Sequence, residues 1–328
     1  MEKSFFDMAL ADTLSSLKNL QNFHLWLNQT KVEDLSVHSL CLSLKSFGRN
    51  LECLSLGFDG TKVTDEGISK LGTEIAPEVK SLKEFRLWVS KTLVGDAGLR
   101  PLFENLNMEK IQVLQLCLSN SRVGDQSLMA LAKENLPRAE SFRILEFWVR
   151  NTSISDLSMI PLMESLSNSV SDVNKLVLSC VRTKLTDWSL GMFSQEIIAN
   201  LRNLRDIQFF LGQSQTNGTK VDLFMDNLAL KVQNIQKFEL ELSNPVMPYN
   251  IRTFADKVLP KMTNIQDFKL FWNASLSTLT YQALCLNAKK VMKNIKTFDI
   301  RPSSFVSRLT PHWLLKTAFN QCILNSAR

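Results

Sequence analysis

Apolar residues alternate with other residues along one short stretch, and this pattern returns along most of the chain. In residues 51–58 the apolar positions are Leu51, Leu54, Leu56 and Phe58. Their period of two is typical of a β-strand with one buried face. The pattern recurs at steps of 29 to 31 residues, and its aligned positions are Phe23, Leu54, Phe85, Leu114, Leu145, Leu176, Ile207, Phe238, Phe268 and Phe298. The chain is therefore predicted to contain about ten similar repeats.

A turn and a helix are predicted to follow each strand. A hydroxyl residue, an aliphatic residue and an aspartate stand two residues apart, as Thr61, Val63 and Asp65 do. We expect the aspartate at the N-cap of a helix, where its carboxylate accepts from free backbone amides. The aspartates of this series are Asp34, Asp65, Asp96, Asp125, Asp156 and Asp187. Apolar residues follow at helical spacing, so each repeat is predicted as strand, turn and helix.

This frame resembles a leucine-rich repeat of the ribonuclease-inhibitor-like kind, in the long variant with 30–31-residue repeats that is common in single-celled eukaryotes. Residues 61–67, Thr-Lys-Val-Thr-Asp-Glu-Gly, match that signature except at the first position, where the family has asparagine. A hydroxyl ladder of shorter reach takes its place, formed by Thr30, Thr61, Thr92, Ser121, Thr152 and Thr183. The resemblance implies an α/β horseshoe solenoid, with a parallel sheet on the concave face and helices on the convex face. It implies no activity, because proteins of one architecture differ in function.

Both ends of the chain depart from the repeat. Residues 1–19 predict an amphipathic helix that caps the first repeat, and residues 302–328 predict a second capping helix at the other end. Thr310 and Pro311 suit the N-cap and first position of that second helix. The repeats occupy residues 20–301 between the two caps.

The seventh position of each repeat is expected to project from the exposed face of the sheet. In chain order it holds Trp26, Gly57, Trp88, Cys117, Trp148, Ser179, Phe210, Glu241, Phe271 and Arg301. Odd repeats carry an aromatic residue and even repeats do not, so the true period is two repeats. Alternate strands lie about 9.6 Å apart, so we expect separate aromatic pillars with open sockets over Gly57, Cys117 and Ser179. The alternative is that the rings lie flat over their small neighbours and only cover the sheet.

Such pillars favour a protein partner, because tryptophan is a common anchor of interfaces. The predicted binding residues are Trp26, Arg86, Trp88, Trp148, Phe210 and Phe271. Arg86 belongs to the fifth position of the repeat, which shares the same face and carries both signs of charge. Its acidic members, among them Glu146 and Glu239, would repel a nucleic-acid backbone, so we do not expect a nucleic-acid partner.

Composition excludes several kinds of chemistry. The net charge of +6 is spread along the 328 residues and forms no basic patch. The six cysteines form no CxxC pair, and most of them fall on core-facing positions, where small buried thiols are expected. The histidines, His24, His38 and His312, are widely separated, and neither HExxH nor a glycine-rich phosphate loop occurs. We therefore expect no enzyme activity, no catalytic residue, no cofactor, no metal site and no small-molecule substrate.

The first 17 residues lack the basic and apolar segments of a targeting signal, and no segment is long enough to span a bilayer. We therefore expect a cytoplasmic protein without membrane insertion. The favoured function is a non-enzymatic interaction scaffold. We expect it to be a structural subunit of a larger assembly, for which a cytoskeletal, axonemal or ciliary assembly is the hypothesis. The alternative is a regulatory adaptor of the GTPase-activating or ubiquitin-ligase substrate-recognition type. An RNA-binding subunit is the third hypothesis.

Overall fold

The computed structural model describes residue 14 and residues 17–212, 220–242, 248–272, 277–291 and 295–302. The chain divides into two compact parts, an N-terminal half (Met1–Val173) and a C-terminal half (Asn174–Arg328), and each half is described by itself. The capping helices predicted for residues 1–19 and 302–328 lie almost entirely outside the described residues.

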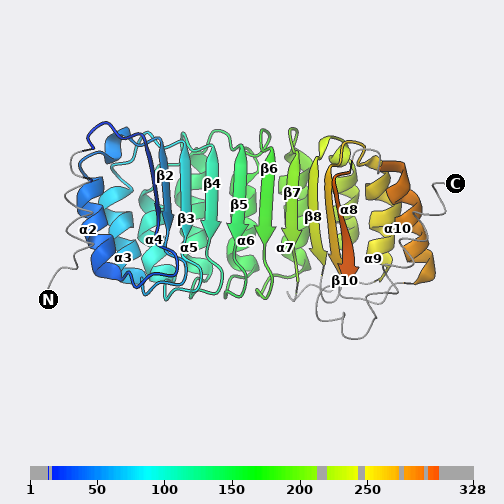
Figure 1. The fold of residues 1–328 in the computed structure, drawn as a ribbon, viewed down its shortest axis with the longest axis horizontal. Coiled ribbons are helices and arrows are strands. Elements are labelled where there is room, and N and C mark those ends of the chain that lie inside the picture. The colour runs from blue at the N-terminus through cyan, green and yellow to red at the C-terminus, as the bar shows by residue number, and fades with distance from the viewer. Residues whose placement is uncertain are drawn as a thin grey trace. The chain divides into compact units, whose positions relative to one another are not determined.

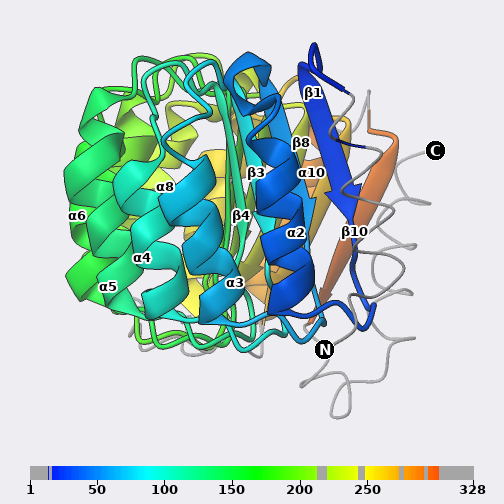
Figure 2. The same cartoon turned by 90° about the vertical axis from the view of Figure 1, so that its left-hand side faces the viewer.

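The N-terminal half consists of parallel strands, each followed by a helix. Its strands are β1 (Asn22–Trp26), β2 (Cys53–Gly57), β3 (Glu84–Trp88), β4 (Val113–Cys117) and β5 (Ile144–Trp148). Its helices are α2 (Asp34–Leu44), α3 (Asp65–Lys70), α4 (Asp96–Asn105), α5 (Asp125–Ala130) and α6 (Asp156–Leu166). Each strand pairs with the next in the register of the repeat. The strands lie side by side in Figure 1, and Figure 2 shows α2 to α6 as a layer on one side of them.

The C-terminal half repeats this arrangement. Its strands are β6 (Lys175–Ser179), β7 (Asp206–Phe210), β8 (Lys237–Leu242), β9 (Asp267–Trp272) and β10 (Thr297–Pro302), again parallel in chain order. Its helices are α7 (Asp187–Met192), α8 (Val221–Ala229), α9 (Pro248–Thr253) and α10 (Thr278–Val291). The predicted α/β class, an open stack of strand and helix repeats, is confirmed in both halves.

The core lies between the sheet and the helices, where the period-two pattern placed it. Leu51, Leu54, Leu56 and Phe58 are each at most 2% exposed, and the equivalent residues of the following repeats are buried in the same way. Since side chains alternate along a strand, the residues between them face away from the helices. The alternation therefore fixes which side of the sheet is left for function.

The aspartates of the series that begins at Asp34 do not occupy the N-cap positions predicted for them. Each of these aspartates is the first residue of its helix, and the N-cap is the residue before it, such as Thr64, whose Oγ1 accepts from the N–H of Glu66 at 3.3 Å. The Asp65 carboxylate instead accepts from the backbone N–H groups of Gly95 (2.6 Å) and Gly98 (3.0 Å) in the next repeat. Asp34, Asp96 and Asp125 bond to the following repeat in the same way. Stacking brings the next helix start within reach, so the aspartates join repeats to one another.

The hydroxyl ladder closes the turn of its own repeat. Thr61 Oγ1 donates to the carbonyl of Phe58 at 2.7 Å and accepts from the N–H of Val63 at 3.4 Å. Gly60, just before it, has a φ of +67° in the left-handed region. The same place is held by Gln29, Lys91, Asn120, Asn151 and Arg182, all with positive φ. A hydroxyl is long enough for this local turn, which explains why it can replace a longer amide side chain.

The two-repeat period is also visible among the helices. Repeats two, four, six and eight continue their α-helix into a π-helical turn, at Leu71–Ile75, Leu131–Asn135, Phe193–Ile197 and Phe254–Val258. The second residue of each turn is small, namely Gly72, Ala132, Ser194 and Ala255. Three of these residues accept a side-chain hydrogen bond at their carbonyl from the next helix, Ala132 from Ser165 (2.7 Å), Ser194 from Asn227 (3.2 Å) and Ala255 from Asn287 (2.8 Å).

Candidate functional site

The candidate site is the exposed face of the sheet in the N-terminal half. Strand register places two rows of side chains across β1 to β5. The aromatic row is Trp26, Gly57, Trp88, Cys117 and Trp148, and the polar row is His24, Ser55, Arg86, Gln115 and Glu146. The alignment made from the sequence is confirmed by this register. Because the alternate residues of the same strands are buried in the core, both rows lie on the side of the sheet away from the helices.

The aromatic row begins with two tryptophans in contact. The Trp26 residue is 51% exposed, and its ring centroid lies 4.5 Å from that of Trp88, with an angle of 62° between the ring planes. A Cβ atom added to Gly57 would lie 2.5 Å from Cε3 of Trp26, so the Trp26 ring covers the glycine. Separate pillars with an open socket over Gly57 are therefore wrong at this position. Each indole is long enough to lean over a residue that has no side chain.

The other predicted binding residues differ in how much surface they offer. Trp88, Trp148 and Phe271 are half-buried, whereas Phe210 in the C-terminal half is only 7% exposed. Trp148 Nε1 donates to Glu146 Oε2 at 3.3 Å, which ties the aromatic row to the polar row. The socket expected over Ser179 is also absent, because Ser179 is fully buried. Trp26 is thus the one predicted binding residue that is exposed.

From Arg86 to Glu146 the polar row is a continuous chain of hydrogen bonds. Arg86 Nη1 lies 2.7 Å from Glu84 Oε2, and Arg86 Nε donates to Gln115 Oε1 at 2.6 Å. Gln115 Nε2 in turn donates to Glu146 Oε1 at 2.7 Å. The Arg86 side chain is 19% exposed. Arg86 was predicted to bind a partner directly, but its donors are largely used by its neighbours, so its clearest role is to fix this surface.

Cys53 and His24 bring a thiol and an imidazole together at the edge of the polar row. Cys53 Sγ lies 3.8 Å from His24 Nε2, donates to Glu84 Oε2 at 3.5 Å and accepts from Arg86 Nη1 at 3.3 Å. Burial raises the pKa of the Cys53 thiol. A neutral thiol is a weak nucleophile, and catalytic Cys–His pairs depend on a lowered thiol pKa. The pair therefore has the residue types of a nucleophilic site, but the pKa of its thiol is shifted upward, which opposes nucleophilic attack.

The pKa values of three further thiols are shifted in the same direction. Burial raises the pKa of Cys41, Cys117 and Cys180. Cys41 and Cys180 are buried as expected, whereas Cys117 is half-buried. In the described part of the chain, no group of His, Cys, Asp and Glu side chains is arranged to hold a metal ion. None of the helices described is long and apolar enough to cross a membrane.

Comparison of the sequence with protein-family models gives no match, and comparison with curated proteins gives no significant match. The functional argument therefore rests on the surface itself. Sequence reasoning found both rows. It missed the contact between Trp26 and Trp88, and it missed the hydrogen bonds that join Arg86 to Gln115 and Gln115 to Glu146. The hydrogen bonds of the polar row could have been predicted, because Arg86, Gln115 and Glu146 are complementary side chains at the fifth position of successive repeats.

Proposed function

We propose that this protein is a leucine-rich repeat protein of the ribonuclease-inhibitor-like kind, and that it serves as a non-enzymatic scaffold that binds a protein partner. The glycine of the signature supports the family. A Cβ atom on Gly67 would lie 2.6 Å from Asp34 Oδ1, and one on Gly98 would lie 2.7 Å from Asp65 Oδ1. The glycine of the signature is thus explained by the aspartate one repeat earlier, whose carboxylate occupies the space that a larger side chain would need.

The exposed Trp26 ring against Trp88 is the observation that carries the proposed function. A tryptophan buries roughly 150–250 Å², so about half of that area remains exposed at Trp26. At about 25 cal/mol per Å², covering roughly 100 Å² contributes about 2.5 kcal/mol to binding. The contact with Trp88 also orients the ring before a partner arrives, which reduces the entropy lost on binding.

The polar row beside the tryptophans supports a protein partner rather than a small molecule. Arg86, Gln115 and Glu146 bond to one another in a line across three strands. This line is a fixed, broad surface next to an apolar anchor, an arrangement typical of a protein interface with an aromatic hot spot and a polar surround. The proposal includes a fixed place in a larger assembly, as the sequence suggested.

The test is to recover the tagged full-length chain from its own cells after mild crosslinking and to identify and quantify what is attached. We expect one stoichiometric partner for the wild type, and loss of that partner for the double variant Trp26→Ala, Trp88→Ala. The double variant must keep the circular dichroism and thermal midpoint of a folded repeat protein. Undiminished capture of the partner by the folded double variant would contradict the proposal.

Two further variants separate the tryptophan geometry from exposed aromatic area in general. Trp188→Ala removes a tryptophan that is 61% exposed on α7, outside the candidate face, and should leave capture unchanged. Gly57→Ala keeps both rings but displaces that of Trp26, so it should weaken capture. Equal losses for Trp188→Ala and the double variant would indicate nonspecific adhesion. Many substoichiometric partners would favour the regulatory adaptor instead.

A further inference from the structure

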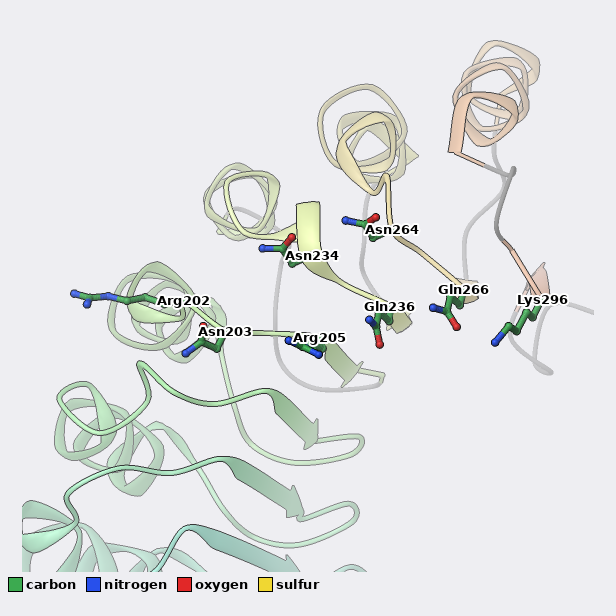
Figure 3. A pocket seen from close by; sticks show the side chains of 8 residues that line it. All are labelled: Arg202, Asn203, Arg205, Asn234, Gln236, Asn264, Gln266 and Lys296. Atoms are coloured by element: carbon green, nitrogen blue, oxygen red, sulfur yellow. The ribbon is translucent and has the colours of Figure 1, made fainter.

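A second surface lies in the C-terminal half, at the edge of the sheet where the strands begin. A groove of about 690 Å³ is lined there by Arg202, Asn203, Arg205, Asn234, Gln236, Asn264, Gln266 and Lys296. Figure 3 shows Arg205, Gln236, Gln266 and Lys296 one after another at the starts of successive strands. Arg202, Asn234 and Asn264 form an outer row toward the helices in the same view. We call this surface the strand-start groove.

The backbone fixes the spacing of the inner row. The N–H of Gln236 donates to the carbonyl of Arg205 at 2.7 Å, that of Gln266 to Gln236 at 2.8 Å, and that of Lys296 to Gln266 at 2.7 Å. Neighbouring strands are about 4.8 Å apart, so Arg205 and Lys296 are separated by three steps, or about 14 Å. Because these backbone groups are already bonded, the groove presents side-chain donors to a ligand.

The residues that line the groove carry a net positive charge. Its lining contains three cationic and five amide side chains and no carboxylate. Within the described residues, Arg202, Arg205 and Lys296 take part in no ion pair. The carboxylate nearest in sequence to Arg205 is that of Asp206, which lies 3.8 Å from Lys237 Nζ and accepts from Gln208 Nε2 at 3.2 Å. An adjoining hollow adds Lys231 and no acidic residue.

The corresponding edge of the N-terminal half is different, although it is built from the same repeat. There Lys83 Nζ lies 2.8 Å from Glu52 Oε2, and Glu52 and Lys83 hold the places that correspond to Gln236 and Arg205, directly before a strand. Arg49 is likewise 2.8 Å from Glu78 Oε2 on the helix side. Lys83 and Arg49 at this edge of the N-terminal half are therefore paired, whereas the three cations of the groove are in no ion pair within the described residues. The repeat architecture alone does not require a positive groove.

We propose that the strand-start groove binds an extended acidic segment of a partner protein. The cations at the two ends of the inner row, Arg205 and Lys296, would each pair with a carboxylate, and the amides of Gln236 and Gln266 would bond the backbone between them. An extended chain advances about 3.3 Å per residue, so the about 14 Å span places the two carboxylates about four residues apart. This surface and its ligand are independent of the tryptophan face.

Nucleic acid fits the groove less well than an acidic peptide. Single-stranded nucleic acid is held by aromatic side chains on which bases stack, together with a track of cations. The lining residues include no aromatic ring and only three cations, and amide side chains fill the space between them. Paired amide donors and acceptors instead match the alternating N–H and C=O groups of a peptide backbone.

The test uses fluorescence anisotropy with the full chain and a labelled serine-based peptide that carries two glutamates about four residues apart. A peptide with glutamine in place of both glutamates and a single-stranded oligothymidylate are the comparison probes. Measurements at about 50 mM and about 500 mM NaCl report the electrostatic share of binding, because salt screens exposed charges. We expect the acidic peptide to bind at low salt, and the glutamine peptide to bind at least about tenfold more weakly.

The variants Arg205→Glu and Lys296→Glu should each weaken binding of the acidic peptide about tenfold or more. Arg143→Glu is the matched control, because Arg143 is exposed and directly precedes β5, as Arg205 precedes β7. It should leave binding unchanged. The proposal is overturned by an equal loss with Arg143→Glu, by tighter binding of the oligothymidylate, or by no binding of the acidic peptide at about 1 mM. None of these outcomes depends on the tryptophan variants.

Discussion

Replacing Asp65 with alanine tests whether each aspartate stabilises the helix of the next repeat. Asp65 is the first residue of α3, yet its carboxylate bonds to Gly95 and Gly98 at the start of α4. The start of α3 has its own partners, since Thr64 caps Glu66 and Asp34 Oδ1 accepts from the N–H of Gly67 at 3.1 Å. We therefore expect Asp65→Ala to loosen the start of α4 while that of α3 remains protected.

The size of the effect follows from the two bonds that are lost. Hydrogen bonds to charged groups contribute about 1.5–3 kcal/mol each, whereas deletion of a helix cap costs about 0.5–2 kcal/mol because water replaces part of the loss. The negative charge near the start of α4 adds about 0.3–1 kcal/mol. A local loss of about 2–3 kcal/mol corresponds to amide exchange that is roughly 30- to 150-fold faster, since 1.4 kcal/mol is about tenfold.

Amide hydrogen exchange read by mass spectrometry can locate this effect. Peptides that cover residues 94–102 report α4, and peptides that cover residues 64–72 report α3. Glu66→Ala is the matched control, because it removes one exposed negative charge from the same turn without a bond to Gly95 or Gly98. It should leave exchange in α4 unchanged. Faster exchange confined to α3 in Asp65→Ala would refute the reasoning, because it would mean that the aspartate stabilises its own helix.

Three further substitutions or conditions test the packing. Gly72→Ala places a Cβ atom 2.6 Å from the carbonyl carbon of Pro101 and closer still to the backbone nitrogen of Leu102. Since backbone cannot yield easily, it should cost more than about 2 kcal/mol, and an unchanged denaturation midpoint would contradict this. Lys91→Gly relieves a φ of +55° and should stabilise the fold by up to about 1 kcal/mol, so a lower thermal midpoint would count against it. Burial raises the pKa of Cys41 from 9.0 to about 12, so this thiol should resist labelling at pH 8 while the protein is folded. Its contribution to stability is complete below pH 9 and declines as the pH rises from 9 toward 12, because only the unfolded thiol ionises there. Rapid native labelling would show that Cys41 is not buried.

Much of the fold was predictable because the strand pattern is strict. The buried positions of β2, the parallel register and the face that carries Trp26 all follow from a period of two within a repeat of about 30 residues. The location of the turn also followed from the sequence. These features depend on backbone geometry and burial, which a simple alternation of apolar and polar residues encodes directly.

Contacts between repeats were less predictable, because they depend on side-chain direction. The N-cap prediction for Asp65 used only the sequence next to it, whereas its carboxylate bonds to a helix about 30 residues later. The separation expected between Trp26 and Trp88 was a distance between strands, and it took no account of rings that lean across Gly57. A search for complementary residues one repeat apart finds the bond of Asp65 and the contact of Trp26 with Gly57, whereas Trp26 and Trp88 stand two repeats apart.

The helices show the same two-repeat period that the sequence showed on the strands. A π-helical turn carries an extra residue and alters the hydrogen-bond pattern of its helix. In repeat four the carbonyl of Ala132 accepts from Ser165 Oγ of the following helix at 2.7 Å. The small residue at this place lets the next helix approach, as Gly72 does at Pro101.

Repeats one, three and five place larger residues there, namely Cys41, Phe103 and Met163, and continue as ordinary helices. An even helix and the odd helix after it are therefore joined by a small residue on the first and, in three of the four described pairs, by a polar donor on the second. An equivalent bond also runs from an odd repeat to the even one after it, because Asn135 Nδ2 donates to the carbonyl of Phe103. The aromatic residues on alternate strands follow the same two-repeat period as the π-helical turns.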